Sequence, residues 1–139
     1  MKSKLLFLLP TLAIFGCNKQ VGPADIAKIN GYWEIEKVIL PDGSTKEYPA
    51  NTIIDFFEIK GNSGIRKKVT PQLDGSYTDN GAPENITVKF ADRKAYLCYN
   101  SNYAKWQEEV IEANDDELVF KNESKLEYHY KKPIPFSKK

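Results

Sequence analysis

The sequence predicts an all-β protein, an antiparallel up-and-down meander that closes into an eight- or nine-stranded barrel with a short N-terminal helix. Short runs rich in β-branched and aromatic residues recur along the chain, and Gly, Pro, Asn or Asp residues separate them. Apolar and polar residues alternate in several of these runs, which gives each strand one buried and one solvated face. The connections leave no room for crossover helices, so neighbouring strands are expected to be antiparallel.

The N-terminal segment has the pattern of a signal peptide. Residues 1–4 include two lysines, and an apolar run follows at 5–15. A run of about 11 residues is too short to cross the roughly 30 Å hydrocarbon core of a bilayer as a helix. The residues Ile-Phe-Gly-Cys at 14–17 resemble the lipobox of bacterial lipoproteins. This resemblance implies cleavage before Cys17 and acylation of Cys17, which would anchor the protein in a membrane; the alternative is an ordinary secretory signal with an incidental cysteine.

The chain is therefore expected to have four parts. These are a lipoprotein signal peptide at 1–16, a lipidated tether at 17–24, a β-barrel domain at 25–135 and a C-terminal tail at 136–139. Removal of the signal peptide also removes Lys2 and Lys4, which leaves 123 residues with 18 Lys and Arg against 19 Asp and Glu, a net charge of −1. Nucleic-acid binding needs clustered positive charge, so no nucleic-acid partner is expected.

The folded part is expected to begin with one or two helical turns. Pro23 is tolerated at a first helical position, and Ile26 and Ile29 are spaced as i and i+3 on one helical face. Strands are expected at 31–40, 53–60, 64–69, 74–79, 85–90, 94–99, 103–113, 117–122 and 125–132. Turn sequences such as Pro41-Asp42-Gly43 separate them. Closure into a barrel would remove exposed sheet edges, and a two-sheet sandwich is the competing architecture.

Catalytic and metal-binding patterns are scarce. His129 is the only histidine, which excludes a site with several histidine ligands. If Cys17 carries lipid, Cys98 has no disulfide partner and is expected to be a small buried hydrophobe. The acidic run at 115–117 is expected to be a solvated turn, and the basic run at 66–68 a solvated rim or a contact for lipid headgroups. We therefore expect a protein that is not an enzyme and has no metal or cofactor.

Residues 31–33, Gly-Tyr-Trp, open the first expected strand and resemble the Gly-X-Trp motif of the lipocalins. Together with the lipobox, the chain resembles the small lipocalin-like lipoproteins of the Bacteroidetes type. The resemblance implies a lipocalin-like barrel over 29–132 in which Gly31 and Trp33 form a structural motif. It also implies that Trp33 plugs the closed end and that a basic side chain of the last strand lies across its ring. That strand has no Arg, so the basic residue would be Lys132 or Lys131; Lys132 is favoured because it shares the parity of Tyr128 and Tyr130.

Two functions follow from this resemblance. The first is a carrier that binds or sequesters a small hydrophobic ligand in the barrel. The side chains expected to line its cavity are Phe57, Ile59, Phe90, Leu97, Trp106, Phe120 and Tyr128. The second is an accessory lipoprotein with a filled barrel that binds a protein partner through its loops or outer face. An apolar cavity of roughly 300 Å³ or more would favour the carrier.

The residues after Cys17 predict the location. Asn18, Lys19 and Gln20 contain no acidic cluster. By resemblance to Bacteroidetes lipoproteins, this sequence predicts a lipid anchor in the outer membrane that faces the periplasm.

Overall fold

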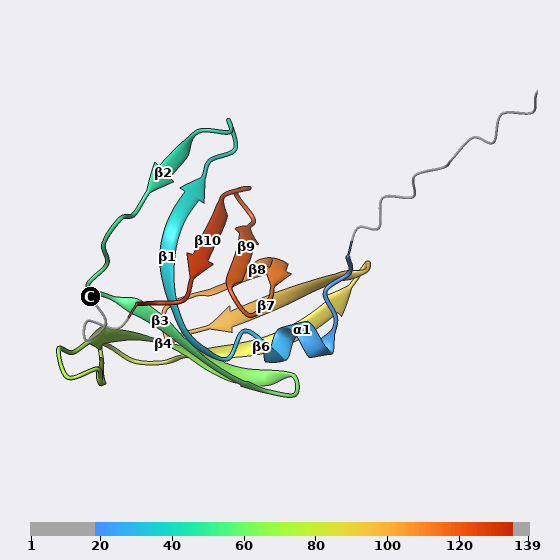
Figure 1. Cartoon of the computed structure of the whole chain (residues 1–139). Helices are drawn as coiled ribbons and strands as arrows, with labels where there is room; N and C mark the ends of the chain where they lie inside the picture. Colours follow the sequence, from blue (N-terminus) through green and yellow to red (C-terminus); the bar gives the residue numbers. More distant parts are fainter. Residues whose placement is uncertain (1–18, 135–139) are drawn as a thin grey trace, which may run out of the picture.

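The structure is a computed structural model that describes residues 19–134 (Figure 1). The expected signal peptide, Cys17 and the tail at 136–139 lie outside the described residues. The elements are α1 (Pro23–Ala27), β1 (Gly31–Ile39), β2 (Thr45–Glu47), β3 (Ile54–Lys60), β4 (Ser63–Pro71), β5 (Tyr77–Asp79), β6 (Glu84–Ala91), β7 (Lys94–Asn100), β8 (Lys105–Ala113), β9 (Glu117–Asn122) and β10 (Glu127–Lys131). No helix within residues 19–134 has the length and apolar character needed to cross a membrane.

The sheet closes on itself, which confirms the barrel and excludes the sandwich. Its strands pair in the order β10-β9-β8-β7-β6-β4-β3-β1, and β1 pairs in turn with β10. Every pairing is antiparallel. The closed ring is an 8-strand barrel, and β2 and β5 are short additions outside it.

Two short strands differ from the prediction. Residues 45–47 were not expected to be a strand, yet β2 pairs with the upper part of β1. The strand expected at 74–79 is reduced to β5, which pairs only with β4. The reason is a tight turn in which Asp74 Oδ1 accepts a hydrogen bond of 2.9 Å from the Ser76 backbone N–H and Gly75 has a φ of +88°. β4 consequently pairs directly with β6 in the ring.

Helix α1 covers one end of the barrel. It begins at Pro23, so two residues of the expected tether belong to the helix. The Asp25 carboxylate accepts a hydrogen bond of 3.0 Å from the Gly22 backbone N–H, which stabilises the helix start. After the helix, the Asn30 side chain bonds both the N–H and the C=O of Ile59, at 2.6 and 3.0 Å. These bonds fasten the segment after α1 to the lower end of β3.

Apolar side chains fill the half of the barrel next to α1. The side chains with 0% exposure in this core are Ile29, Trp33, Phe57, Ala95, Leu97, Leu118 and Phe120. Two aromatic contacts extend the core upward, because the Phe120 ring lies 5.8 Å from Phe57 and 5.7 Å from Tyr130 between ring centroids. At about 25 cal/mol per Å² of buried apolar area, this filled half supplies much of the stability.

Trp33 plugs the closed end. Its indole N–H donates a hydrogen bond of 2.8 Å to the Ile29 carbonyl, and Lys132 Nζ lies 3.8 Å from its ring centroid. Gly31 has a φ of +113°, which favours glycine, and a Cβ there would lie 3.8 Å from Lys132 Nζ. Lys132 therefore covers the Trp33 ring and lies next to the space that a side chain at position 31 would enter.

Two β-bulges shift the alternation of inward and outward side chains. One lies between Ile35 and Lys37 in β1 and the other between Val110 and Glu112 in β8. Before the bulges the buried residues include Trp33 in β1 and Val110 in β8. After the bulges Val38 and Ala113 are buried, so the inward positions have shifted by one residue in each strand. Bulges also increase strand bending, and so help the sheet to close.

We expect Trp33→Ala to lower the free energy of unfolding by about 3 to 5 kcal/mol, because it removes a large side chain from a filled core. Lys132→Ala should cost about 0.5 to 1 kcal/mol, as expected for an exposed cation–π contact. The cost of Lys132→Ala should largely vanish in a Trp33→Phe background. Chemical denaturation of the four proteins measures this cycle. Lys131→Ala is the matched control, and additive effects of the Lys132 and Trp33 changes would contradict the contact.

Candidate functional site

A cavity of about 270 Å³ lies in the barrel above the apolar core. Its lining comes from β4, β8, β9 and β10 and consists of Arg66, Lys68, Trp106, Glu108, Asn122, Tyr128 and Tyr130. The register explains this set: Arg66 pairs with Phe57, Glu108 with Leu97 and Tyr128 with Phe120, so each lies on the same face as a core residue. The cavity therefore combines aromatic rings with charged groups.

Arg66 is the central cation of this region, at 9% exposure. Its Nε and Nη2 donate to Glu84 Oε2 at 2.6 and 2.5 Å. Its guanidinium lies 4.4 Å from the Tyr99 ring centroid and 6.0 Å from that of Trp106, while the Tyr99 and Trp106 rings stack at 5.2 Å. Burial lowers the pKa of Arg66, but Tyr99 and the nearby carboxylates outweigh it and raise that pKa above its ordinary value. Arg66 is therefore a fixed, already paired charge.

Glu108 is a buried carboxyl without a short partner. It is 5% exposed, and Arg66 Nη1 approaches its Oε1 only to 3.6 Å, beyond hydrogen-bond range. Among the described residues, Glu108 Oε1 and the Tyr99 hydroxyl are both buried with no hydrogen-bond partner. Burial raises the pKa of Glu108, and the Arg66 charge and the nearby Tyr99 hydroxyl oppose this only in part. Burial and the neighbouring Glu108 raise the pKa of Tyr99 well above its ordinary value.

A second ion pair lies at the edge of the cavity. Asp55, at 4% exposure, pairs with Lys68, which faces it across β3 and β4. The charged groups in and around the cavity are the carboxylates of Asp55, Glu84 and Glu108 and the cations Arg66 and Lys68. Burying such groups is costly unless each is paired. The carboxyl that lacks a short partner is Glu108.

The structure places the seven expected lining residues in three environments. Trp106 and Tyr128 line the cavity. Phe57, Leu97 and Phe120 have 0% exposure and belong to the core, so the prediction that they line open space is wrong. Ile59 and Phe90 lie instead at a hollow of about 150 Å³ beside α1, where Phe90 is 43% exposed. Strand parity predicted which side chains point into the barrel, but it did not predict how far along the barrel these side chains form a packed core.

The expectation of a solvated rim at 66–68 is wrong for Arg66, which is buried and points into the barrel. Lys68 lines the edge of the cavity with its side chain 47% exposed, and Lys67 lies outside, where its Nζ is 5.4 Å from the Phe56 ring centroid. Glu108 was not singled out, although it lies two residues from Trp106 and therefore shares its face. The alternation of inward and outward side chains around Trp106 could have identified Glu108 as an inward residue, and the same alternation within 66–68 could have identified Arg66.

Other sequence candidates lie outside the cavity. Cys98 is not fully buried, because it faces outward in β7 with its Sγ 3.9 Å from Gln107 Oε1. His129 lies beside Glu127 at 3.3 Å on the outer face of β10. Residues 115 and 116 form the β8–β9 turn, where Asn114 Oδ1 accepts hydrogen bonds from the next backbone N–H groups. Within residues 19–134, no group of His, Cys, Asp or Glu side chains is arranged to hold a metal ion.

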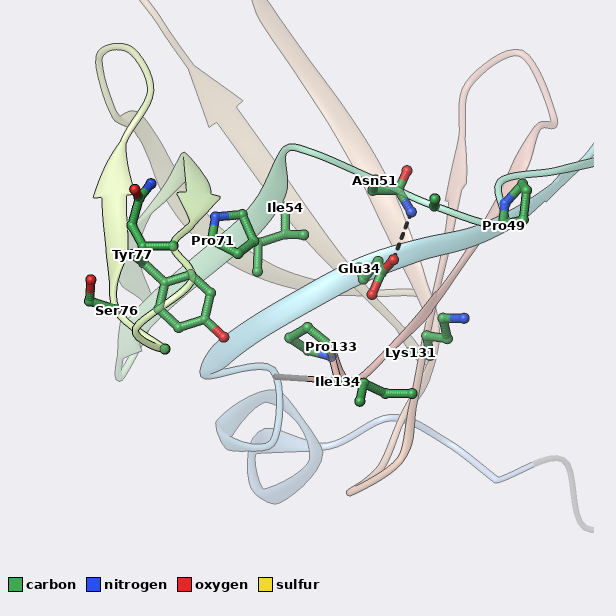
Figure 2. Close-up of a pocket in the computed structure, with 13 residues that line it drawn as sticks. Glu34, Pro49, Asn51, Ile54, Pro71, Ser76, Tyr77, Lys131, Pro133 and Ile134 are labelled. Carbon is green, nitrogen blue, oxygen red and sulfur yellow. Dashed lines mark hydrogen bonds between the residues drawn. The ribbon is translucent and has the colours of Figure 1, made fainter. Parts of the chain in front are cut away.

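Another hollow, of about 190 Å³, lies on the outer wall beside β1 (Figure 2). The loop before β3, the β4–β5 turn and the chain after β10 line it, with Pro49, Pro71, Tyr77, Pro133 and Ile134 among the side chains. Its Glu34 carboxylate accepts a hydrogen bond of 3.0 Å from Asn51, which also bonds the Ile35 carbonyl at 2.9 Å. The Glu34 and Asn51 side chains of this hollow already bond each other, whereas Glu108 Oε1 in the barrel cavity is buried without a hydrogen-bond partner among the described residues, so the cavity inside the barrel is the stronger candidate site.

We expect Glu108→Gln to become more stable relative to the wild type as the pH rises from about 4.5. The pKa of Glu108 is raised on folding, so its contribution to stability is complete below its unfolded pKa and is lost as pH rises through its folded pKa. The difference in free energy of unfolding between Glu108→Gln and the wild type should grow by about 1.4 kcal/mol per pH unit, across the pH range in which Glu108 is protonated in the folded state and ionised in the unfolded state. Denaturant unfolding between pH 4 and 8 measures it.

Glu109→Gln is the matched control for this experiment. Glu109 is the next residue, and it faces outward with its carboxylate 3.2 Å from Lys94. If the stability of the two variants depends on pH in the same way, ionisation of Glu108 does not destabilise the folded state more than ionisation of Glu109 does.

Comparison with known proteins agrees with this architecture. A family model described as a lipocalin-like domain matches residues 29–120. Similar solved structures include a lipocalin-like protein from Bacteroides uniformis, with 13% identity over 76% of this chain and 99% of that chain and a TM-score of 0.46. An uncharacterized protein from Bacteroides eggerthii has 15% identity over 75% of this chain and 98% of that chain, also with a TM-score of 0.46. No curated protein matches the sequence significantly. Since the family match covers more than half of the chain, the protein belongs to the lipocalin-like domain family.

Proposed function

We propose that this protein is a membrane-anchored lipocalin-like lipoprotein that binds a small ligand in the cavity of its barrel. The observation that carries the proposal is the buried carboxyl of Glu108, which lines the cavity and whose Oε1 has no hydrogen-bond partner among the described residues. A barrel that only needed stability would gain by placing an apolar side chain there, because a buried carboxyl with incomplete hydrogen bonding is costly. A ligand that completes its bonding would account for it.

The lining residues favour a ligand with polar groups over the purely hydrophobic ligand that the sequence predicted. The cavity of about 270 Å³ does not meet the expectation of roughly 300 Å³ or more of apolar space, because it holds Arg66, Lys68 and Glu108 beside the rings of Trp106 and Tyr128. Long apolar ligands need a deep apolar space, and here side chains fill the lower half of the barrel. A compact molecule with one flat apolar part and one polar end fits this lining.

The second candidate function is that of an accessory lipoprotein that binds a protein partner. The filled lower half of the barrel favours it, as does the hollow on the outer wall beside β1 (Figure 2). The presence or absence of a bound small molecule separates the two functions.

The proposed anchor would orient the barrel at the membrane. Five residues lie between Cys17 and Pro23, so the six steps along the chain can reach at most about 20 Å at 3.3 to 3.6 Å per residue. Because α1 covers the closed end, an acylated Cys17 would hold that end near the lipid surface. The cavity at the other end would then face away from the membrane.

We expect protein isolated from its own host to carry a small molecule that native mass spectrometry detects. Trp106→Ala should lose this molecule with a smaller loss of stability than Trp33→Ala, because Trp106 lies at the cavity and is only partly buried. Tyr103→Ala is the control, since this nearby aromatic residue is 97% exposed. Wild-type protein without any bound molecule would contradict the ligand-binding function and favour the accessory one.

We also expect Cys17→Ser to move the protein from the membrane fraction to the soluble fraction, or to leave an uncleaved precursor, because the acylated residue is removed. Cell fractionation followed by intact-mass measurement tests this. Cys98→Ser is the matched control and should remain in the membrane fraction. The anchor is excluded if the unmodified protein fractionates as soluble.

A further inference from the structure

We propose that the ligand of the barrel cavity is a small organic cation, a protonated amine attached to one flat apolar ring, whose N–H groups bond Glu108 while the ring packs on Trp106. This inference rests on the proposed function, because it names the class of ligand for the same cavity.

The cavity has a free hydrogen-bond acceptor, so a ligand that donates a hydrogen bond would fit it. Arg66 already gives its Nε and one Nη to Glu84, at 2.6 and 2.5 Å. Lys68 already pairs with Asp55. Glu108, in contrast, is 5% exposed, its Oε1 is buried without a hydrogen-bond partner among the described residues, and its ion pair with Arg66 is long, at 3.6 Å. A ligand that donates an N–H therefore fills an unmet need, whereas a ligand carboxylate would have to displace an existing partner of Arg66 or Lys68.

The charges of the surrounding side chains favour a positive ligand. Three carboxylates, from Asp55, Glu84 and Glu108, surround two cations, from Arg66 and Lys68. With all five groups ionised the cluster has a charge of −1. Burial raises the pKa of Glu108, and an ammonium group beside Glu108 would favour its ionised form and neutralise that charge. The low dielectric of a buried site strengthens this attraction relative to water.

The aromatic lining suits the same ligand. Trp106, Tyr128 and Tyr130 contribute rings to the cavity wall around Glu108. Ring faces attract cations, and a flat apolar group stacks on an indole. The Trp106 indole is held in place because it stacks on Tyr99 at 5.2 Å between ring centroids. A carboxylate with several rings around it is the arrangement that recognises an ammonium group joined to an aromatic body.

The test compares three probes that share one ring and differ in the polar end: 2-phenylethylammonium, 2-phenylethanol and phenylacetate. Each is titrated into the full chain, and binding is read from the indole N–H signals in NMR spectra. The chain has two tryptophans, so Trp106 reports on the cavity and Trp33, fully buried in the core, is an internal reference. We expect the ammonium probe to bind about tenfold more tightly than the alcohol, and the carboxylate more weakly than both.

Glu108→Gln should reduce the affinity for the ammonium probe about tenfold, to near that of the alcohol. Glu109→Gln removes the same charge from the outer face and should leave the affinity unchanged. The comparison of probes on the wild-type chain stands even if Glu108→Gln fails to fold.

Each other outcome overturns the inference. If phenylacetate or the alcohol binds as tightly as the ammonium probe, or if the two glutamine variants behave alike, the ligand class is wrong and the proposed function stands. If no probe shifts the Trp106 signal while the host protein carries a bound molecule, the class is again wrong. If no probe binds and the host protein is also empty, both the inference and the proposed function fail.

Discussion

The pairing of β1 with β10 is the contact on which the rest of the structure depends. These strands come from opposite ends of the domain, and their pairing turns an open meander into a closed ring without exposed edges in the ring. The same contact brings the chain after β10 to the start of β1, where Lys132 covers Trp33 and approaches Gly31. The pairing of β1 with β10 therefore closes the ring and also places the residues that close one end of the barrel.

The closed end also determines where a ligand can bind. α1, Trp33 and the apolar side chains above them occupy the lower half of the barrel completely. Open space begins only where the inward positions become polar, at Arg66 on β4 and Glu108 on β8. The division of the interior into an apolar filled half and a polar open half separates stability from binding: the first supplies buried apolar area, and the second holds charged groups that cost stability.

The charged groups of the open half form an incomplete network. Arg66 is satisfied by Glu84 and by the ring of Tyr99, and Asp55 by Lys68. Among the described residues, Glu108 Oε1 and the Tyr99 hydroxyl are buried without a hydrogen-bond partner, and Arg66 reaches Glu108 only at 3.6 Å. Partly satisfied buried networks destabilise a fold, and this network lies beside the cavity to which we assign the proposed ligand. The lipocalin-like family is consistent with such a role, and the chemistry of the ligand depends on these particular side chains.

The sequence by itself determined the strands of the ring, although not β2 or the extent of β5, and its resemblance to the lipocalins indicated the closed end. Turn residues and alternation located every strand of the ring, because both are local properties of the chain, and the Gly-X-Trp motif with the parity of Lys132 indicated the plug. Only the tertiary structure decided the site. Alternation shows which side chains point inward. Leu97 on β7 and Glu108 on β8 are paired partners that both point inward, yet Leu97 lies in the packed core and Glu108 lines the cavity. This difference depends on how neighbouring strands are staggered and on which large side chains meet across the barrel. Those contacts join residues far apart in the sequence, and local patterns do not encode them.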